Sequence, residues 1–506
     1  MRTMLSSSSS PAMRRLQLLS ACLTALLIPL CFTGPAVVLS AISAELGGSA
    51  AQLSWIMNAY ILSYGGAMMV SGSLTDIYGQ RRIWLIGMLW FCAFTIAIPF
   101  MPSVFWIDIL RMMQGLGGAA AFAAAMSSLA PLFEARARAR AFSLLGTSFG
   151  LGLSFGPWFF GWIVEALQWQ GVFYATGAIG VVGLLLVLIS TKPSQGGSQG
   201  ALDWPGAISF TLALGLFTYG MLLIPERGWS DSWVLSTLLA SVVAFVGFVC
   251  IERRVAQPMI DLSFFRDPGF VGVQALAAAP AFLFIVLIVL LPGRFMGIDG
   301  YGALQAGQMM VWLAAPLLIV PFVAALLTRW LSAGTLSSLG LLLVAVGLWT
   351  LAEGFEAGGG PALHLPLLLI GVGIGLPWGL MDGMAVSVVS PDRVGMATGI
   401  FNTVRISADG VAIAVVSVLL ASLIQQHLRV GSTTFTQAAV LEAASRAALG
   451  ELQLAAQQLP GLEAQLAASY AASFLTVLHA LAGLAALIAG LLFVLLRQPK
   501  HALQTA

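Results

Sequence analysis

A few ionisable side chains stand inside long apolar runs of this 506-residue sequence, where they could bind and release protons. Asp382 has no basic residue at helical spacing, so its carboxyl is expected to exchange a proton in apolar surroundings. Asp108 precedes Arg111 by three residues and Asp409 follows Arg405 by four, so each pair can share one helix face. We predict Asp382 and Arg111 as the proton-coupling residues, with the other three as further candidates. The alternatives are a solvated Asp382 without a coupling role and two structural ion pairs.

The composition indicates which kind of element must hold these side chains. Hydrophobic residues make up 59% of the chain and charged residues only 8%, whereas about a quarter of the residues of a soluble domain are charged. Apolar runs of about twenty residues, each long enough to cross a bilayer, recur along the sequence. A soluble enzyme, a nucleic-acid binder and a disordered scaffold are therefore excluded, and the chain is expected to cross a membrane many times.

No motif indicates a metal or cofactor site. The four cysteines lie in apolar runs without paired spacing: Cys22, Cys31, Cys92 and Cys250. No HExxH, P-loop or GxSxG pattern occurs on a suitable element. We therefore expect no bound metal, no cofactor and no enzymatic reaction.

Fourteen helical spans are predicted from the apolar runs. They lie near 17–42, 52–72, 83–101, 104–132, 139–166, 171–191, 203–224, 233–251, 268–292, 303–328, 335–353, 362–390, 396–425 and 470–496. Sixteen of the 22 lysines and arginines fall on the side of the N-terminus, which predicts that both termini are cytoplasmic. The predicted parts are cytoplasmic tails at 1–16 and 497–506, six-helix bundles at 17–191 and 268–496, and a linker with spans seven and eight at 192–267. An outer loop at 426–469 is expected to carry one or two surface helices, broken by Pro460.

The connection after the second predicted span has the spacing of a conformational latch. It reads Gly72-Ser-Leu-Thr-Asp76-Ile-Tyr-Gly79-Gln-Arg81-Arg82. Asp76 ends a helix where the macrodipole is already negative, so a partner gained in one conformation and lost in another could hold or release it. An ordinary charged loop is the alternative. The segment resembles the signature loop of the major facilitator superfamily, with Ile77 and Gln80 in place of two basic residues.

Two further segments resemble motifs of the same superfamily. In the fourth span, Arg111 and Gln114 match a motif whose arginine faces the central cavity and is implicated in proton coupling. The fifth span resembles the antiporter motif that marks exporters, through Gly152, Gly156, Pro157 and Gly161. Phe160 stands where that motif usually has a glycine. Close packing through small residues is the plain alternative.

The resemblance extends to the fourteen-span drug:proton antiporter branch over residues 20–496. One departure concerns the first span, where that branch carries an acidic residue and this sequence places Cys31. A thiol in apolar surroundings keeps its proton, so coupling must use another acid or differ in kind.

Polar and aromatic side chains of the presumed cavity spans could bind flat amphiphilic molecules or cations. The substrate-cavity candidates are Tyr60, Tyr64, Gln114, Trp158 and Trp378. Lipid-facing packing and interfacial belts are the alternative for most of the aromatic residues.

The resemblance implies an all-α integral membrane protein with the major facilitator fold, built from two six-helix bundles and two extra central helices. It also implies a multidrug-resistance-type antiporter of the bacterial inner membrane, which uses the proton gradient to expel drugs, toxins or metabolites by alternating access. A proton-coupled importer and a non-transporting sensor or structural relative are the alternatives. Expected partners are a small-molecule substrate and the lipid bilayer, with a periplasmic adaptor as a further candidate and no nucleic acid; the protein is expected to function as a monomer.

Overall fold

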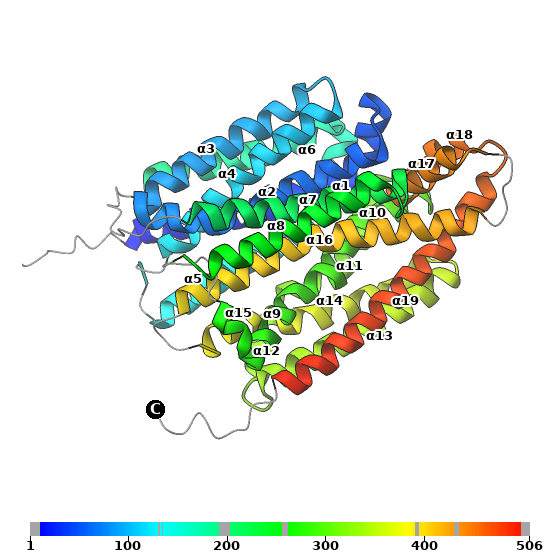
Figure 1. The fold of residues 1–506 in the computed structure, drawn as a ribbon. Helices are drawn as coiled ribbons and strands as arrows, with labels where there is room; N and C mark the ends of the chain where they lie inside the picture. Colours follow the sequence, from blue (N-terminus) through cyan, green and yellow to red (C-terminus); the bar gives the residue numbers. More distant parts are fainter. Residues whose placement is uncertain are drawn as a thin grey trace, which may run out of the picture.

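The computed structural model describes residues 11–129, 132–133, 135–191, 203–255, 262–389, 394–429 and 435–496. Within these ranges the chain is built from helices and contains no β-strand (Figure 1). The predicted all-α fold is therefore confirmed.

The first eight α-helices are long. Their bounds are α1 Pro11–Leu46, α2 Ala50–Tyr78, α3 Gln80–Ala97, α4 Val104–Leu129, α5 Ala135–Leu167, α6 Gln170–Ser190, α7 Trp204–Arg227 and α8 Ser232–Glu252. Carboxylates begin several helices, because they accept hydrogen bonds from backbone N–H groups that have no partner within the helix. Asp203 accepts such a bond from Gly206 at the start of α7, and Asp231 accepts one from Trp233 at the start of α8, both at 2.9 Å.

The helices of the second half are interrupted more often. Their bounds are α9 Pro268–Pro280, α10 Val286–Gly297, α11 Ala303–Ala314, α12 Val320–Leu327, α13 Ala333–Glu356, α14 His364–Trp378, α15 Met381–Ser387, α16 Val394–Arg429, α17 Gln437–Ala448, α18 Leu452–Gln458 and α19 Glu463–Leu495. A π-helical turn, η4 (Ala281–Ile285), joins α9 to α10, and a 3₁₀ turn, η5 (Ala315–Leu318), joins α11 to α12. Pro280 and Pro316 lie at these interruptions, because proline lacks the N–H that continues a helix.

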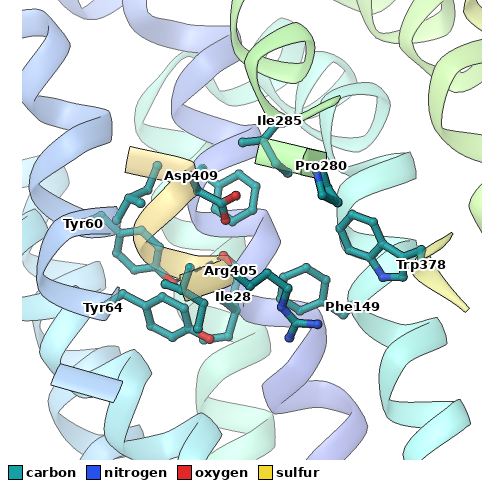
Figure 2. Close-up of a pocket in the computed structure, with 12 residues that line it drawn as sticks. Ile28, Tyr60, Tyr64, Phe149, Pro280, Ile285, Trp378, Arg405 and Asp409 are labelled. Carbon is teal, nitrogen blue, oxygen red and sulfur yellow. Dashed lines mark hydrogen bonds between the residues drawn. The ribbon is translucent and has the colours of Figure 1, made fainter. Parts of the chain in front are cut away.

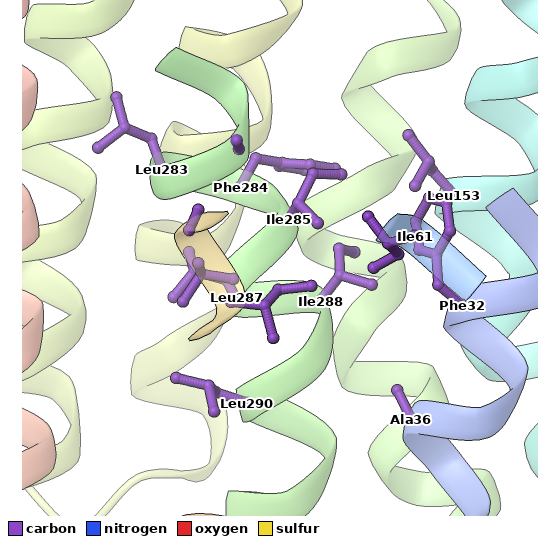
Figure 3. Packing of buried hydrophobic residues seen from close by; sticks show 14 of the residues in the cluster. Phe32, Ala36, Ile61, Leu153, Leu283, Phe284, Ile285, Leu287, Ile288 and Leu290 are labelled. Carbon is purple, nitrogen blue, oxygen red and sulfur yellow. The ribbon is translucent and has the colours of Figure 1, made fainter. Parts of the chain in front are cut away.

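Helices from distant parts of the sequence pack against one another. Helix α1 packs on α5 and α6, and α2 packs on α4, within the N-terminal half. Across the two halves, α2 packs on α16, α5 on α11, and α1 on α10. Figure 3 shows the apolar core at this junction, where Ile285 and Ile288 lie on the side of Phe32 and Ile61.

Helices α17 and α18 lie together at one end of the bundle, while both ends of the described chain lie at the opposite end (Figure 1). They occupy the segment for which surface helices were predicted, and Pro460 lies between α18 and α19. Helices are thus present in this segment as predicted, but α16 runs to Arg429 and α19 begins at Glu463, so the loop is shorter than 426–469. Its position on the outer face stays a prediction.

Twelve segments among the described residues are long and apolar enough to cross a membrane. Helices α2 and α5 are not among these twelve, although they contain 29 and 33 residues and pack within the same bundle. The count of fourteen spans therefore stays a prediction, as do the predicted domain boundaries.

Candidate functional site

A pocket lies between the two halves of the bundle (Figure 2). Most of its lining is apolar or aromatic: Ile28, Phe32, Tyr60, Ile61, Tyr64, Phe149, Pro280, Ile285, Trp378, Arg405, Ile406 and Asp409. These side chains come from α1, α2 and α5 on one side and from α9, η4, α14 and α16 on the other. A movement of one half against the other would therefore change the shape and the access of this central pocket.

The charges of the central pocket come from one helix. Arg405 and Asp409 lie one turn apart on α16, and both side chains are among those that line the pocket (Figure 2). Among the described residues no ion pair joins them, because the guanidinium of Arg405 contacts Asp382 instead. The prediction of an Arg405–Asp409 ion pair is therefore wrong in this conformation. Asp409 is half-buried and presents its carboxyl group to the pocket.

Asp382 lies in different surroundings from those predicted. It belongs to the first turn of α15, and its side chain is 66% exposed. Its Oδ1 accepts a hydrogen bond from Arg405 Nη1 at 3.5 Å. The prediction of an unpaired, desolvated carboxyl is therefore wrong, because its cation comes from another helix and not from helical spacing along the sequence. A role of Asp382 in coupling stays a prediction.

Arg111 is completely buried in α4 and is held by neutral groups. Its Nε donates a hydrogen bond to the carbonyl of Ile56 at 2.7 Å, and its Nη2 donates to the carbonyl of Cys31 at 2.6 Å. Its Nη1 donates to the side-chain oxygen of Gln114. The guanidinium also lies 4.5 Å from the centre of the Tyr60 ring, where the negative face of the ring stabilises a cation.

A proline explains why the carbonyl of Cys31 can accept this bond. In a regular α-helix this carbonyl would accept from the backbone N–H four residues later. That residue is Pro35, which lies inside α1 and has no N–H to donate. Arg111 supplies the missing donor from α4. A proline inside α1 and a buried cation thus form one unit, which joins α1, α2 and α4.

Asp108 does not pair with Arg111, contrary to the prediction from their spacing. Among the described residues no ion pair joins the two, and Asp108 Oδ1 is buried without a hydrogen-bond partner. Helix α4 directs the guanidinium toward α1 and α2 instead. The self-neutralised pair that the sequence offered as an alternative is therefore wrong.

The thiol of Cys31 lies beside the same network. Cys31 is 2% exposed, and its Sγ accepts a hydrogen bond from Gln114 Nε2 at 3.6 Å. The same Nε2 donates to Thr95 Oγ1 at 2.6 Å. Gln114 was predicted to line the cavity, but it lies within this N-terminal network and not among the residues of the central pocket.

Comparison with known proteins identifies the family. The sequence profile of the Major Facilitator Superfamily matches residues 21–413. The chain belongs to this superfamily.

Two relatives extend this match. Multidrug resistance protein Stp of Mycobacterium tuberculosis is 30% identical over 373 residues, which cover 73% of this chain and 69% of that protein. The tetracenomycin C resistance and export protein of Streptomyces glaucescens is 26% identical over 409 residues, which cover 80% and 76%. The protein is therefore a membrane transporter of this superfamily and not an enzyme.

A solved structure shows the same fold. A bacterial homologue of the human lysosomal transporter Spinster, in an inward-facing and occupied conformation, matches with a TM-score of 0.70 at 16% identity. The match covers 97% of this chain and 98% of that one. The major facilitator fold predicted from the sequence is thus confirmed.

Three of the predicted cavity residues line the central pocket of this transporter: Tyr60, Tyr64 and Trp378. The rings of Tyr60 and Tyr64 stack with their centres 5.9 Å apart and their planes 6° apart. Trp158 is 42% exposed and does not line the pocket. Phe149 was missed, since nothing in the sequence near α5 indicates that its ring lies beside Trp378 of α14, 6.4 Å between ring centres.

The glycines of the antiporter-like segment allow α5 to approach two helices closely. A Cβ at Gly152 or Gly156 would collide with α1, and one at Gly161 would collide with α11. Pro157 lies within α5 between these contacts. These glycines therefore allow close packing of α5 against α1 and α11. A role of this segment in exchange transport stays a prediction.

The predicted latch is described only in part. Gly79 ends α2 and begins α3 with φ at +89°, a conformation that glycine adopts readily. Arg81 Nη2 donates to a backbone carbonyl of α6 at 3.5 Å, Arg82 is exposed, and Gly72 lies within α2. The side chain of Asp76 lies outside the described part of the protein, so the ionic contacts of the latch stay a prediction.

Proposed function

We propose that this transporter exports small amphiphilic molecules in exchange for protons, and that Asp409 is its proton-binding residue. One observation carries the proposal: among the residues that line the central pocket, Asp409 is the acidic one. A carboxyl group there can bind a proton in one state of the transporter and release it in another. In the N-terminal half, Asp108 also has a buried carboxyl oxygen without a partner among the described residues, but it does not line the central pocket.

Arg405 supports this assignment because it lies near two carboxyl groups. It contacts Asp382 in this structure, while Asp409 lies one turn away on the same helix. An ionised Asp409 would attract the guanidinium into the pocket, whereas a protonated Asp409 would leave it with Asp382. The contact with Asp382 is long and partly exposed, so it opposes this movement only weakly.

This movement would link proton binding to substrate binding. A protonated Asp409 and a withdrawn Arg405 change the charge that the pocket presents to a bound molecule. Proton and substrate then favour different states of the transporter, and exchange follows from this difference in affinity. The rings of Tyr64, Phe149 and Trp378 line the pocket and provide apolar surface for the substrate.

The relatives support the outward direction, since one is named a multidrug resistance protein and another a resistance and export protein. We further propose that the protein acts as a monomer in a bacterial inner membrane, with both termini cytoplasmic. The positive-inside distribution supports this orientation. It places α17 and α18 on the outer face, where a periplasmic adaptor would have to bind.

Proton release from everted vesicles tests the proposal. The vesicles are acidified inside by respiration, and a panel of cationic, neutral and anionic amphiphilic compounds is added. We expect some of these compounds to trigger proton release with the unchanged protein and none to do so with Asp409→Asn. The comparison variant is Asp382→Asn, which removes the carboxyl that Arg405 contacts in this structure; because that contact is long, proton release should be reduced but not abolished.

Three results would overturn the proposal. Release that persists in Asp409→Asn would remove this residue from coupling. Release that is lost in Asp382→Asn but kept in Asp409→Asn would return the role to the residue that the sequence favoured. Uptake of a compound together with protons into right-side-out vesicles would indicate an importer.

A further inference from the structure

The hairpin formed by α17 and α18, residues 437–458, is tied to the N-terminal half of the transporter by one arginine. Arg446 Nη2 donates a hydrogen bond to the carbonyl of Gly48, in the turn between α1 and α2, at 2.8 Å. The same guanidinium pairs with Glu442 at 2.8 Å and with Glu451 at 3.1 Å. The hairpin is inserted between α16 and α19, so this contact bridges the two halves at the end of the bundle that carries it.

The turn between α17 and α18 lies between the two halves. Gly450 has φ at +85°, and a Cβ on it would lie only 2.6 Å from the Cα of Gly293 in α10. Leu449, the preceding residue, packs against an apolar cluster of the N-terminal half. The turn therefore touches α10 on one side and the N-terminal half on the other, and only glycine fits at its centre.

A second pocket lies beneath this turn. It is lined by Ala36, Leu39, Ser54, Met57, Asn58, Val289, Leu290, Ile413, Ser417, Ala448 and Leu449. Helices α1, α2 and α16 contribute residues to both pockets. On each of these helices, the residues that line the second pocket lie nearer to the hairpin than those that line the central pocket. On α10, Val289 and Leu290 follow Ile285 of the central pocket in the same way. The two pockets thus lie in sequence along one set of helices.

The second pocket differs from the central one in its chemistry. None of its lining residues in the described part of the chain is ionisable, and their polar side chains are those of two serines and Asn58. Asn58 is 1% exposed, and its Oδ1 has no hydrogen-bond partner among the described residues. A buried acceptor without a partner is costly, so a bound molecule that donates an O–H or N–H there would be stabilised.

We propose that the second pocket is a release compartment on the outward path and that the α17–α18 hairpin is its lid. This inference rests on the proposed direction of transport. A molecule leaving the central pocket would place its apolar part against Leu39 and Leu290 and donate a hydrogen bond to Asn58. It would leave the ionic contacts of Arg405 and Asp409 behind, which favours release. The lid opens when Arg446 leaves Gly48 and the Leu449–Gly450 turn withdraws.

The charges of the hairpin make Arg446 the decisive contact. The side chain of Glu451 is 1% exposed, and burial raises the pKa of its carboxyl while the neighbouring Arg446 guanidinium opposes that shift. Removing Arg446 would leave a buried carboxylate without its counter-charge, which is strongly destabilising. The substitution Arg446→Gln should therefore release the hairpin and not merely remove one hydrogen bond.

A cysteine reporter tests the lid without any knowledge of the substrate. Ser417→Cys places a thiol in the second pocket, and Ser230→Cys places one in the exposed turn between α7 and α8 as a labelling control. Intact cells are treated with a membrane-impermeant maleimide. With the native hairpin we expect slow reaction at residue 417, and with Arg446→Gln or Gly450→Ala an increase of about tenfold, as a shift in the closed–open population would give.

The chain offers a matched control for the glycine substitution. Gly461 has φ at +86°, like Gly450, but a Cβ there would meet no atom of the described residues within 4 Å. Gly461→Ala therefore imposes the same backbone strain without touching α10, and it should leave the reaction at residue 417 unchanged. Equal reaction rates in all hairpin variants, or an equal increase with Gly461→Ala, would overturn the lid. The reaction at residue 230 should be constant throughout.

A second readout separates failure of the lid from failure of the proposed function. For any compound that the parent exports, bulky modification of Ser417→Cys in the Gly450→Ala background should stop export, and modification of Ser230→Cys should not. Continued export after complete modification at residue 417 would place the path elsewhere and overturn the release compartment. If no compound of the panel is exported, the proposed function fails, while the labelling rates still decide whether the hairpin is a lid.

Discussion

The two halves of the transporter each place an arginine near the central pocket, but they surround it with opposite chemistry. Arg111 of the N-terminal half is completely buried, and its hydrogen bonds go to two backbone carbonyls and an amide. Arg405 of the C-terminal half has a side chain that is 17% exposed and lies near two carboxyl groups. Arg111 is held by neutral acceptors in fixed positions, whereas Arg405 can pair with either of two carboxyl groups.

This difference indicates that the two arginines have different roles. A cation held by backbone carbonyls of other helices has one favourable position, because those carbonyls move only with the helices themselves. A cation beside two carboxyl groups has two positions, and protonation of either acid changes their relative free energy. We therefore expect Arg111 to hold the N-terminal half together and Arg405 to respond to protons.

The largest effect on stability is expected from Arg111→Gln. Three donated hydrogen bonds are lost, and the carbonyl of Cys31 is left buried without a donor because Pro35 cannot supply one. We expect the free energy of unfolding in detergent to fall by about 3 kcal/mol, as for several buried groups left unpaired. Thermal unfolding followed by tryptophan fluorescence would measure it. A loss no greater than that of Arg405→Gln would break the comparison.

A smaller effect on stability is expected from placing an acidic residue at position 31, where the sequence has Cys31. Cys31→Asp places a carboxyl group beside Arg111, and Cys31→Asn is its uncharged match. We expect Cys31→Asp to be more stable than Cys31→Asn at neutral pH by about 1–2 kcal/mol, since an opposite charge within a few ångströms stabilises a buried cation. The difference between their unfolding midpoints measures this directly. Equal midpoints would mean that the neutral acceptors already satisfy Arg111 fully.

Arg405→Gln should abolish proton coupling with little change in the stability of the protein. Its contact with Asp382 is long and partly exposed, so we expect a loss of stability below about 1 kcal/mol. Substrate-triggered proton release should nevertheless be lost, because Asp409 would no longer have a cation that responds to its charge. Measuring both properties on one preparation sharpens the comparison. Normal proton release by this variant would contradict the role given to Arg405.

The smallest effect is expected from Pro35→Ala. The new N–H could donate to the carbonyl of Cys31 and compete with Arg111, but a carbonyl oxygen can accept two hydrogen bonds. We expect a change in unfolding free energy within about 1 kcal/mol, the usual size of one hydrogen bond. In the Arg111→Gln background the same substitution should recover part of the lost stability, because the orphaned carbonyl gains a donor. Unfolding midpoints of the single and double variants would show whether it does.

The sequence by itself determined the class of protein and its family. Composition and the length of the apolar runs indicated a membrane protein with many helices, because burial in lipid requires long continuous apolar segments. The helices of the hairpin were also recognisable within the predicted loop at 426–469, since helical periodicity and Pro460 are local features. Tyr60, Tyr64 and Trp378 were found because aromatic residues in the spans of such a protein are natural candidates for a cavity.

Only the tertiary structure decided which charges meet. Spacing along one helix predicted Asp108 for Arg111 and Asp409 for Arg405, and neither pair forms among the described residues. Apart from Gln114 on α4 itself, the partners are contributed by other helices: backbone carbonyls of α1 and α2 for Arg111, and Asp382 in α15 for Arg405. A buried charge takes the best acceptor that packing brings within reach, and packing between helices is not encoded by the spacing within any one of them.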